Sequence, residues 1–421
     1  MSISQRMNRA GILTALVIAC TMTACDALAA QSSSRAAADS ASYPHAAEPI
    51  GTVRQMYDGA LTPEMAVNTF RNIDRLFPTR VVAHGAHPKP LPLSDTPLGD
   101  VRFRDGDAIY TLDQYLDLNR VAGLLVLKNG RIALERYRYG NSERTRWMSM
   151  SVAKSITSTL VGAALAQHRI ASLEDPVTKY VSSLTGSAYD GVSVRDILMM
   201  SSGVRWNETY TDSSSDRRHL LEAQISQRPG SAMQLMRTLP RAAKPGYLNN
   251  YSTGETQVAG EIVRNAVDRP LADYLADRIW SRYAMEANAK WWLDSRDGHE
   301  IGGSGFSATL RDYGRFGLFI LDGGFANGKP ILPNGWVHEA STPKRLRDGS
   351  ELPYGYFWWP GTTPAERRDG AFEANGIFGQ HIYINPARKL VIVVWGAQTK
   401  PTGGAVIDSW KFFDAVTEQL R

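Results

Sequence analysis

The strongest constraint on the fold of this chain is a pair of hairpin patterns that lie far apart in the sequence. In residues 121–138, Asn129-Gly130 separates two apolar runs. This dipeptide is a strong hairpin signal because both residues tolerate positive φ. A second hairpin is predicted from residues 380–384 and 390–395, joined by a turn at Asn385-Pro386-Ala387. The two patterns predict antiparallel strands toward both ends of the chain.

Between the hairpins, apolar residues follow a helical period. After Ser151, Val152, Ile156 and Leu160 recur every four residues, which predicts a helix. Strands at both ends with helices between them favour an α+β fold, with one antiparallel sheet built from both termini, flanked by helices, and a helical insertion. Further helices are predicted over residues 194–200, 270–283, 309–321 and 405–420. We expect one domain over residues 51–421, its sheet part at about 100–150 and 300–421 and its helical part at about 151–300.

The N-terminus has the pattern of an export signal. Residues 1–29 carry early basic residues and a short apolar run that cannot span a bilayer. Ala27-Leu28-Ala29 fits an ordinary signal-peptidase site, whereas Cys20 and Cys25 each end a lipoprotein-like box, so secretion and a lipid anchor to a bacterial membrane are both open. Residues 30–50, rich in Ser and Ala, predict a flexible tether. We expect an exported protein, either periplasmic or a membrane-tethered lipoprotein.

The composition excludes several classes of function. Both cysteines lie in the predicted signal, so the mature body has no thiol for a disulfide, a nucleophile or a zinc site. The 47 basic and 42 acidic residues give a net charge of +5 without a long basic block, which argues against nucleic acid as a partner. The eight histidines are scattered, so we expect no metal and no cofactor.

A candidate nucleophile comes from the spacing of Ser151 and Lys154. On a helix, residues i and i+3 share a face, so the lysine amine can reach the serine hydroxyl and act as its base once burial lowers its pKa. The pattern recurs at Ser341 and Lys344, but Pro343 interrupts that copy and no helix follows. We interpret the second copy as a surface turn.

Two segments resemble a known superfamily. Residues 148–155, MSMSVAKS, and residues 196–204, DILMMSSGV, are similar to motifs of the serine β-lactamases and penicillin-binding proteins. Within that superfamily the chain most resembles class C-like esterases and 6-aminohexanoate-dimer hydrolases. The resemblance implies a β-lactamase/transpeptidase-like fold and a serine hydrolase that works through an acyl-enzyme on Ser151.

The family's tyrosine motif has two candidates here. Tyr247 gives the literal Y-x-N but directly follows Pro245-Gly246, whereas Tyr251 has the family spacing from that dipeptide and is followed by Gly260 at the expected distance. We choose Tyr251 as the catalytic tyrosine. Its hydroxyl would relay the proton of the serine to the leaving group.

The family's K-T-G strand corresponds here to Ala374-Asn375-Gly376, in which only the glycine survives. The resemblance implies that Gly376 and Asn375 bind substrate and that the amides of Ile377 and Ser151 form the oxyanion hole. A purely structural role of Gly376 in a sheet bend is the alternative. In β-lactamases, the lysine of this triplet helps to hold the carboxylate of the drug. Because that lysine is absent here, the resemblance favours esters or amides without a carboxylate.

The loop of residues 205–210 resembles the pocket wall of the family. Trp206 and Tyr210 are therefore predicted either to contact substrate or to pack in the core. We predict an exported serine hydrolase, a carboxylesterase or amidase, whose partner is a small ester or amide. The alternatives are a β-lactamase, a D-alanyl-D-alanine carboxypeptidase, or a non-catalytic penicillin-binding-like sensor. The sequence makes no prediction about oligomeric state.

Overall fold

The computed structural model describes residues Tyr43–Arg421. The described residues belong to two units, of which the first ends at Glu48 and the second comprises Pro49–Arg421. In the first unit, residues 43–48 form a turn in which His45 Nδ1 lies 2.9 Å from Glu48 Oε1. The predicted signal peptide and most of the predicted tether lie outside the described residues. Between Tyr43 and the C-terminus, every helix is too short or too polar to cross a bilayer.

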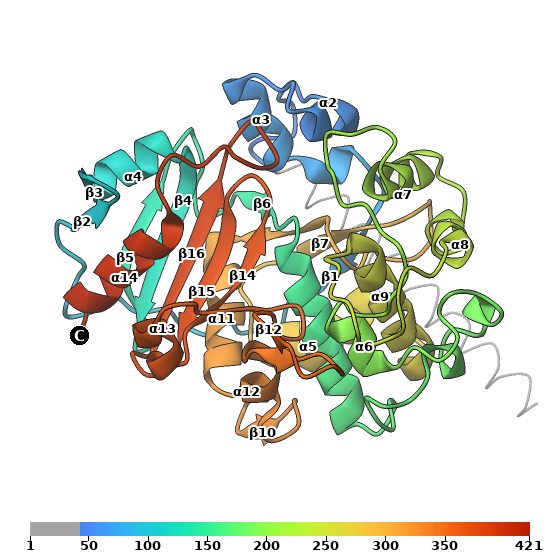
Figure 1. The fold of residues 1–421 in the computed structure, drawn as a ribbon. Coiled ribbons are helices and arrows are strands. Elements are labelled where there is room, and N and C mark those ends of the chain that lie inside the picture. Colours follow the sequence, from blue (N-terminus) through green and yellow to red (C-terminus); the bar gives the residue numbers. More distant parts are fainter. Residues whose placement is uncertain (1–42) are drawn as a thin grey trace, which may run out of the picture. The chain divides into compact units, whose positions relative to one another are not determined.

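The central element of the second unit is a six-stranded antiparallel sheet to which both hairpins contribute (Figure 1). Asn129 and Gly130 turn the first hairpin with φ of +51° and +75°. The two hairpins meet because the last strand pairs with the first strand of the N-terminal hairpin, which confirms a sheet built from both ends. The strand order is β13 (Trp359–Pro360), β14 (Phe372–Gly376), β15 (Gln380–Asn385), β16 (Leu390–Gly396), β4 (Val121–Lys128) and β5 (Arg131–Tyr137).

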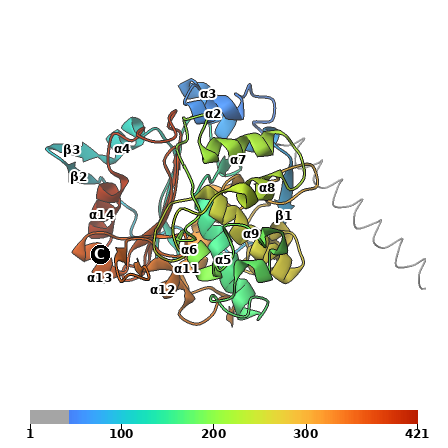
Figure 2. The same cartoon turned by 45° about the vertical axis from the view of Figure 1, so that its right-hand side comes forward.

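Both faces of this sheet are covered, as the view in Figure 2 shows. Leu124 and Val126 of β4 belong to the core under α4 (Leu112–Leu118) and α14 (Ser409–Gln419). Leu125 and Leu127 point to the opposite face, against α11 (Leu310–Leu321). This alternation is the period of two expected of a strand, and covering both faces explains why β4 is apolar throughout.

Helices fill most of the region between the hairpins, as predicted. They are α5 (Val152–Ala166), α6 (Val194–Leu198), α7 (Asp216–Ile225), α8 (Ser231–Thr238), α9 (Thr253–Val267) and α10 (Leu271–Leu275). Helix α5 is buried over residues 152–164 and packs against α9 and β14. This position puts the start of α5 beside the edge of the six-stranded sheet (Figure 1).

The prediction of one sheet was wrong, because a second antiparallel sheet lies outside the first. Its order is β1 (Thr79–Val82), β7 (Ala289–Trp292), β8 (Phe306–Thr309) and β6 (Arg146–Met148). These strands have three or four residues each, too few to show a period of two in the sequence. The second sheet matters for function, since β6 leads directly into Ser151.

Predicted helix positions were right and some of their ends were not. Helix α14 begins at Ser409, later than predicted, because the side chain of Asp408 caps it by accepting from Trp410 N at 3.0 Å. Within residues 270–283, α10 gives way to a wider turn at Ala276–Trp280. The remaining elements are short: α2 (Val53–Asp58), α3 (Pro63–Phe70), β2 (Arg102–Asp105), β3 (Ala108–Thr111), β9 (Phe325–Ala326), β10 (Lys329–Pro330), α12 (Trp336–Ser341), β11 (Lys344–Arg345), β12 (Glu351–Leu352) and α13 (Pro364–Asp369).

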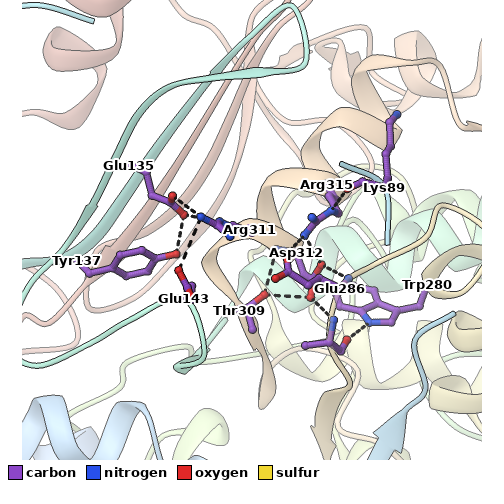
Figure 3. A network of polar contacts seen from close by, with 11 residues as sticks. Lys89, Glu135, Tyr137, Glu143, Trp280, Glu286, Thr309, Arg311, Asp312 and Arg315 are labelled. Atoms are coloured by element: carbon purple, nitrogen blue, oxygen red, sulfur yellow. Dashed lines mark hydrogen bonds and ion pairs between the residues drawn. The ribbon is translucent and has the colours of Figure 1, made fainter. Parts of the chain in front are cut away.

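Polar side chains of α11 tie the large sheet to the loop that precedes β7 (Figure 3). Arg311 binds Glu135 of β5 through two hydrogen bonds of 2.8 Å. The fully buried Asp312 accepts from the amides of Glu286 and Ala287 at 2.7 and 2.9 Å, and Arg315 pairs with it at 3.0 Å. This network fixes α11 at the sheet surface.

Candidate active site

The candidate nucleophile Ser151 stands where β6 meets α5. Met150 has φ of +42°, so the chain turns sharply through a left-handed residue immediately before the serine. Ser151 is the N-cap residue of α5 and is 8% exposed. The positive end of the helix dipole therefore faces any negative charge that forms at its hydroxyl.

Lys154 lies one turn further along α5, and its Nζ is 2.9 Å from Ser151 Oγ. The side chain is 1% exposed. Burial lowers the pKa of Lys154 to about 7, an effect that Glu208 opposes and Arg217 supports. The amine is thus available in its neutral, proton-accepting form near neutral pH.

Two further oxygens surround the Lys154 amine. Nζ lies 2.9 Å from Thr253 Oγ1, in the first turn of α9, and 3.1 Å from the carbonyl oxygen of Gly303. Gly303 allows this approach, because a Cβ there would come within 2.9 Å of Thr253 Cγ2. The sequence reasoning missed both residues. Thr253 could have been suspected from its place two residues after Tyr251, whereas no pattern marks Gly303.

The structure places Tyr251, and not Tyr247, beside the lysine. The ring of Tyr251 lies 5.4 Å from Lys154 Nζ, whereas Tyr247 is 47% exposed. The Tyr251 ring stacks on Trp359 at 5.7 Å and meets Tyr354 edge-on at 6.2 Å. Burial and the charge of Glu208 raise the pKa of Tyr251, against a hydrogen bond with Ser151 that lowers it. Tyr251 therefore stays a phenol, a proton donor, over the range in which Lys154 becomes neutral.

Gly376 brings the end of β14 against the start of α5. A Cβ at Gly376 would lie 2.7 Å from Ser149 O and 3.0 Å from Ser151 N, so only glycine fits without displacement. The amide of Ile377 follows at once, and neither it nor the Ser151 amide donates to an acceptor among the described residues. Two free amides at one edge of the serine have the composition of an oxyanion hole.

A sequence profile of the family described as Beta-lactamase matches residues 112–416. The chain belongs to the beta-lactamase family. A relative named 6-aminohexanoate-dimer hydrolase, from Paenarthrobacter ureafaciens, is 30% identical over 329 residues, which are 72% of this chain and 82% of the relative. The chain is therefore a serine hydrolase that resembles 6-aminohexanoate-dimer hydrolase and esterases, as the sequence motifs predicted.

Solved structures with the same fold carry several hydrolase names. A candidate 6-aminohexanoate-dimer hydrolase from Bacillus anthracis superposes with a TM-score of 0.71 at 24% identity, covering 83% of this chain and 91% of that one. The hydrolase EstCE1 gives 0.54 at 14% identity over 73% and 96% of the two chains, and a class C beta-lactamase gives 0.52 at 16% over 72% and 92%. These likenesses confirm the predicted β-lactamase/transpeptidase-like fold.

The remaining predicted site residues of this beta-lactamase-family enzyme occupy different places. Asn375 lies on the opposite face of β14 from Gly376, and its Nδ2 donates to Glu373 Oε1 at 3.1 Å. Trp206 is 6% exposed and its indole N–H donates to Glu208. Tyr210 is half-buried, and its ring lies 6.4 Å from the ring of Tyr57. Of these three side chains, Trp206 is connected to Lys154 through hydrogen bonds of Glu208 and Thr253.

Glu208 is a third functional candidate that the sequence did not predict. It lies in the loop flagged as a pocket wall, between Trp206 and Tyr210, and receives hydrogen bonds from the backbone N–H and the hydroxyl of Thr253. No motif spacing connects residue 208 to residue 253. The contact depends on the packing of α9 beside this loop, which sequence spacing does not predict.

The second serine–lysine pair is not a second site. Ser341 ends α12 and Lys344 begins β11, and the lysine amine donates to Glu339 O and to Thr342 Oγ1, the latter at 3.3 Å. The prediction of a surface turn was wrong, since Ser341 is buried at the end of α12. Lys344 is half-buried under the ring of Tyr356, and burial lowers its pKa to about 8. No hydrogen bond joins Ser341 to Lys344 in the described part of the chain.

Proposed function

We propose that this chain cleaves small ester or amide substrates through an acyl-enzyme on Ser151. The observation that carries the proposal is the 2.9 Å contact between Ser151 Oγ and the buried amine of Lys154, whose pKa lies at about 7. A serine of ordinary acidity needs a neighbouring base to attack a carbonyl carbon. Lys154 supplies this base without a histidine.

The proposed reaction has two halves. In acylation, the Ser151 O–H bond breaks, the proton passes to Lys154 Nζ, and Oγ bonds to the substrate carbonyl carbon. Hydrogen bonds from the Ser151 and Ile377 amides stabilise the negative charge on the former carbonyl oxygen. Tyr251 donates a proton to the leaving group as the old bond breaks and recovers one from Lys154. In deacylation, water bonds to the acyl carbon and loses a proton to Tyr251, Tyr251 passes its own proton to Lys154, and Lys154 returns a proton to Ser151 Oγ as the bond between Oγ and the acyl carbon breaks.

Acyl groups without a carboxylate fit this site better than β-lactams. The residues of β14 on the same face as Gly376 are Phe372 and Ala374, and none of the three brings a cation to hold a carboxylate. Arg217, which lowers the pKa of Tyr251, is 4% exposed and donates to the hydroxyl of Tyr57. The likeness to a 6-aminohexanoate-dimer hydrolase supports linear amides as one substrate class.

A comparison of substrates and serine variants tests the proposal. The full chain should hydrolyse a short-chain p-nitrophenyl ester with a much higher kcat/KM than a chromogenic cephalosporin, and should also be assayed on a short linear amide. Ser151→Ala should lose turnover by several orders of magnitude, whereas the matched variant Ser341→Ala should keep it. Full activity in Ser151→Ala, or a cephalosporin as the better substrate, would overturn the assignment. A wild-type chain that hydrolyses none of these would point to a non-catalytic sensor.

We further propose that the protein is exported and works in the periplasm, free or tethered by a lipid on Cys20 or Cys25. The support is the charged and apolar pattern of residues 1–29. Mass spectrometry of the mature N-terminus distinguishes cleavage after Ala29 from an acylated cysteine. An intact Met1 on a cytosolic protein would contradict export.

A further inference from the structure

The three oxygens around Lys154 determine where its lone pair points. A neutral amine has two N–H donors and one lone pair, and here it faces Ser151 Oγ, Thr253 Oγ1 and Gly303 O at 2.9, 2.9 and 3.1 Å. A carbonyl oxygen can only accept, so Gly303 takes one N–H. Whether Thr253 Oγ1 accepts a hydrogen bond from Lys154 or donates one to it then decides whether the lone pair faces the serine.

Glu208 fixes the direction of the Thr253 hydroxyl. One carboxylate oxygen of Glu208 accepts hydrogen bonds from Thr253 N, at 2.9 Å, and from the indole N–H of Trp206. Both of these groups can only donate. The other oxygen receives the Thr253 hydroxyl. A carboxylate accepts and does not donate, so the single hydrogen of Thr253 Oγ1 is used by Glu208. Thr253 Oγ1 must then accept from Lys154.

We propose that Glu208 is a positioning residue that acts through Thr253 to turn the lone pair of neutral Lys154 toward the Ser151 hydroxyl. Both N–H groups of the amine are held, by Thr253 and by Gly303, and the lone pair is left for the serine proton. Without the carboxylate, the Thr253 hydroxyl is free to turn and donate to Lys154, which would occupy the lone pair. This inference rests on the proposed function of Ser151.

Glu208 also acts on Lys154 through its charge. The charged groups that act on the amine are the Glu208 carboxylate, which raises its pKa, and the Arg217 guanidinium, which lowers it. Its neutral neighbours include the ring of Tyr251 and the hydroxyls of Ser151 and Thr253. Removing the carboxylate while keeping its size should therefore lower the pKa of Lys154 further. A residue that merely packs the loop would not shift this pKa.

The rate at which a fluorophosphonate labels the protein tests the inference without a known substrate. The second-order labelling constant is measured from pH 5 to 10 for the full-length wild type and for Glu208→Gln. We expect the plateau of Glu208→Gln to fall by about tenfold to a hundredfold, a fraction of what a general base contributes, and its midpoint to move to lower pH. Glu222→Gln, on the surface of α7 and paired with Arg54, is the matched control and should behave as wild type.

A pair of threonine variants keeps the test decisive if Glu208→Gln folds poorly by circular dichroism. Thr253→Val removes the hydroxyl and should lose a similar factor, while Thr253→Ser restores it and should recover most of the rate. A Glu208→Gln plateau and midpoint equal to wild type, or equal rates for Thr253→Val and Thr253→Ser, would overturn the inference alone. A wild-type protein that is not labelled at any pH would overturn the proposed function instead.

Discussion

Substituting alanine for Gly376 should disable the oxyanion hole while leaving the nucleophile and base in place. The new Cβ would start 2.7 Å from Ser149 O and 3.0 Å from Ser151 N. Carbon and oxygen atoms settle at about 3.3 Å even in close contacts, so β14 and the start of α5 must separate by about 0.6 Å. Catalytic groups lose their productive geometry beyond about 0.5 Å.

The expected loss is that of one oxyanion donor. Such a loss costs about 10²–10³ in kcat, or about 2.7–4 kcal/mol of transition-state stabilisation. KM should change little, because the interaction forms only as charge develops on the carbonyl oxygen. The crowding should also lower the free energy of unfolding by about 1–3 kcal/mol, so the assay belongs well below the melting temperature.

The assay for Gly376→Ala is steady-state hydrolysis of a p-nitrophenyl ester, corrected for the fraction of protein that a fluorophosphonate labels. Gly99→Ala is the control, since only Gln419 Nε2, the end of a flexible side chain, lies within 4 Å of its new Cβ. A Gly376→Ala enzyme with kcat within about threefold of wild type would refute this placement of the oxyanion hole.

Three further predictions concern the base, the acid and the framework. The kcat/KM of the wild type should rise with pH around a midpoint near 7, because only deprotonated Lys154 accepts a proton; a flat profile from pH 5 to 9 would contradict this. Tyr251→Phe should slow linear amides by about 10²–10⁴ but p-nitrophenyl esters far less, because p-nitrophenolate leaves without a proton; equal losses on both substrates would exclude Tyr251 as the proton donor. Asp312→Ala should lower the free energy of unfolding in urea by about 2–4 kcal/mol, because the buried amides of Glu286 and Ala287 lose their acceptor while Arg315 keeps its ion pair with Glu286; a loss under 1 kcal/mol would show that other groups replace the carboxylate.

Local signals predicted the parts of this fold that depend on few residues. Asn129-Gly130 marks its hairpin because the turn itself requires positive φ at both positions, and these are the values that the structure has. The strands of the second sheet gave no such signal. A segment as short as Arg146–Met148 becomes a strand only through its pairing with β8, a distant part of the chain.

The same distinction applies to the site. Ser151 and Lys154 are brought together by one helical turn, so their spacing was sufficient to pair them. Glu208 lies in a loop and Thr253 lies in α9, and sequence spacing does not predict that these two segments pack together. The half-buried state of Lys344 was missed for a similar reason, since the ring of Tyr356 that covers it comes from a separate loop.

The most direct test of the central claim is to locate the covalent adduct. The full chain is treated with a fluorophosphonate, digested and analysed by mass spectrometry, beside a Ser151→Ala variant and a heat-unfolded sample. The account predicts one adduct, on Ser151, that is absent from both of these samples. An adduct on another residue, or a wild-type enzyme that hydrolyses esters but forms no adduct on Ser151, would contradict it.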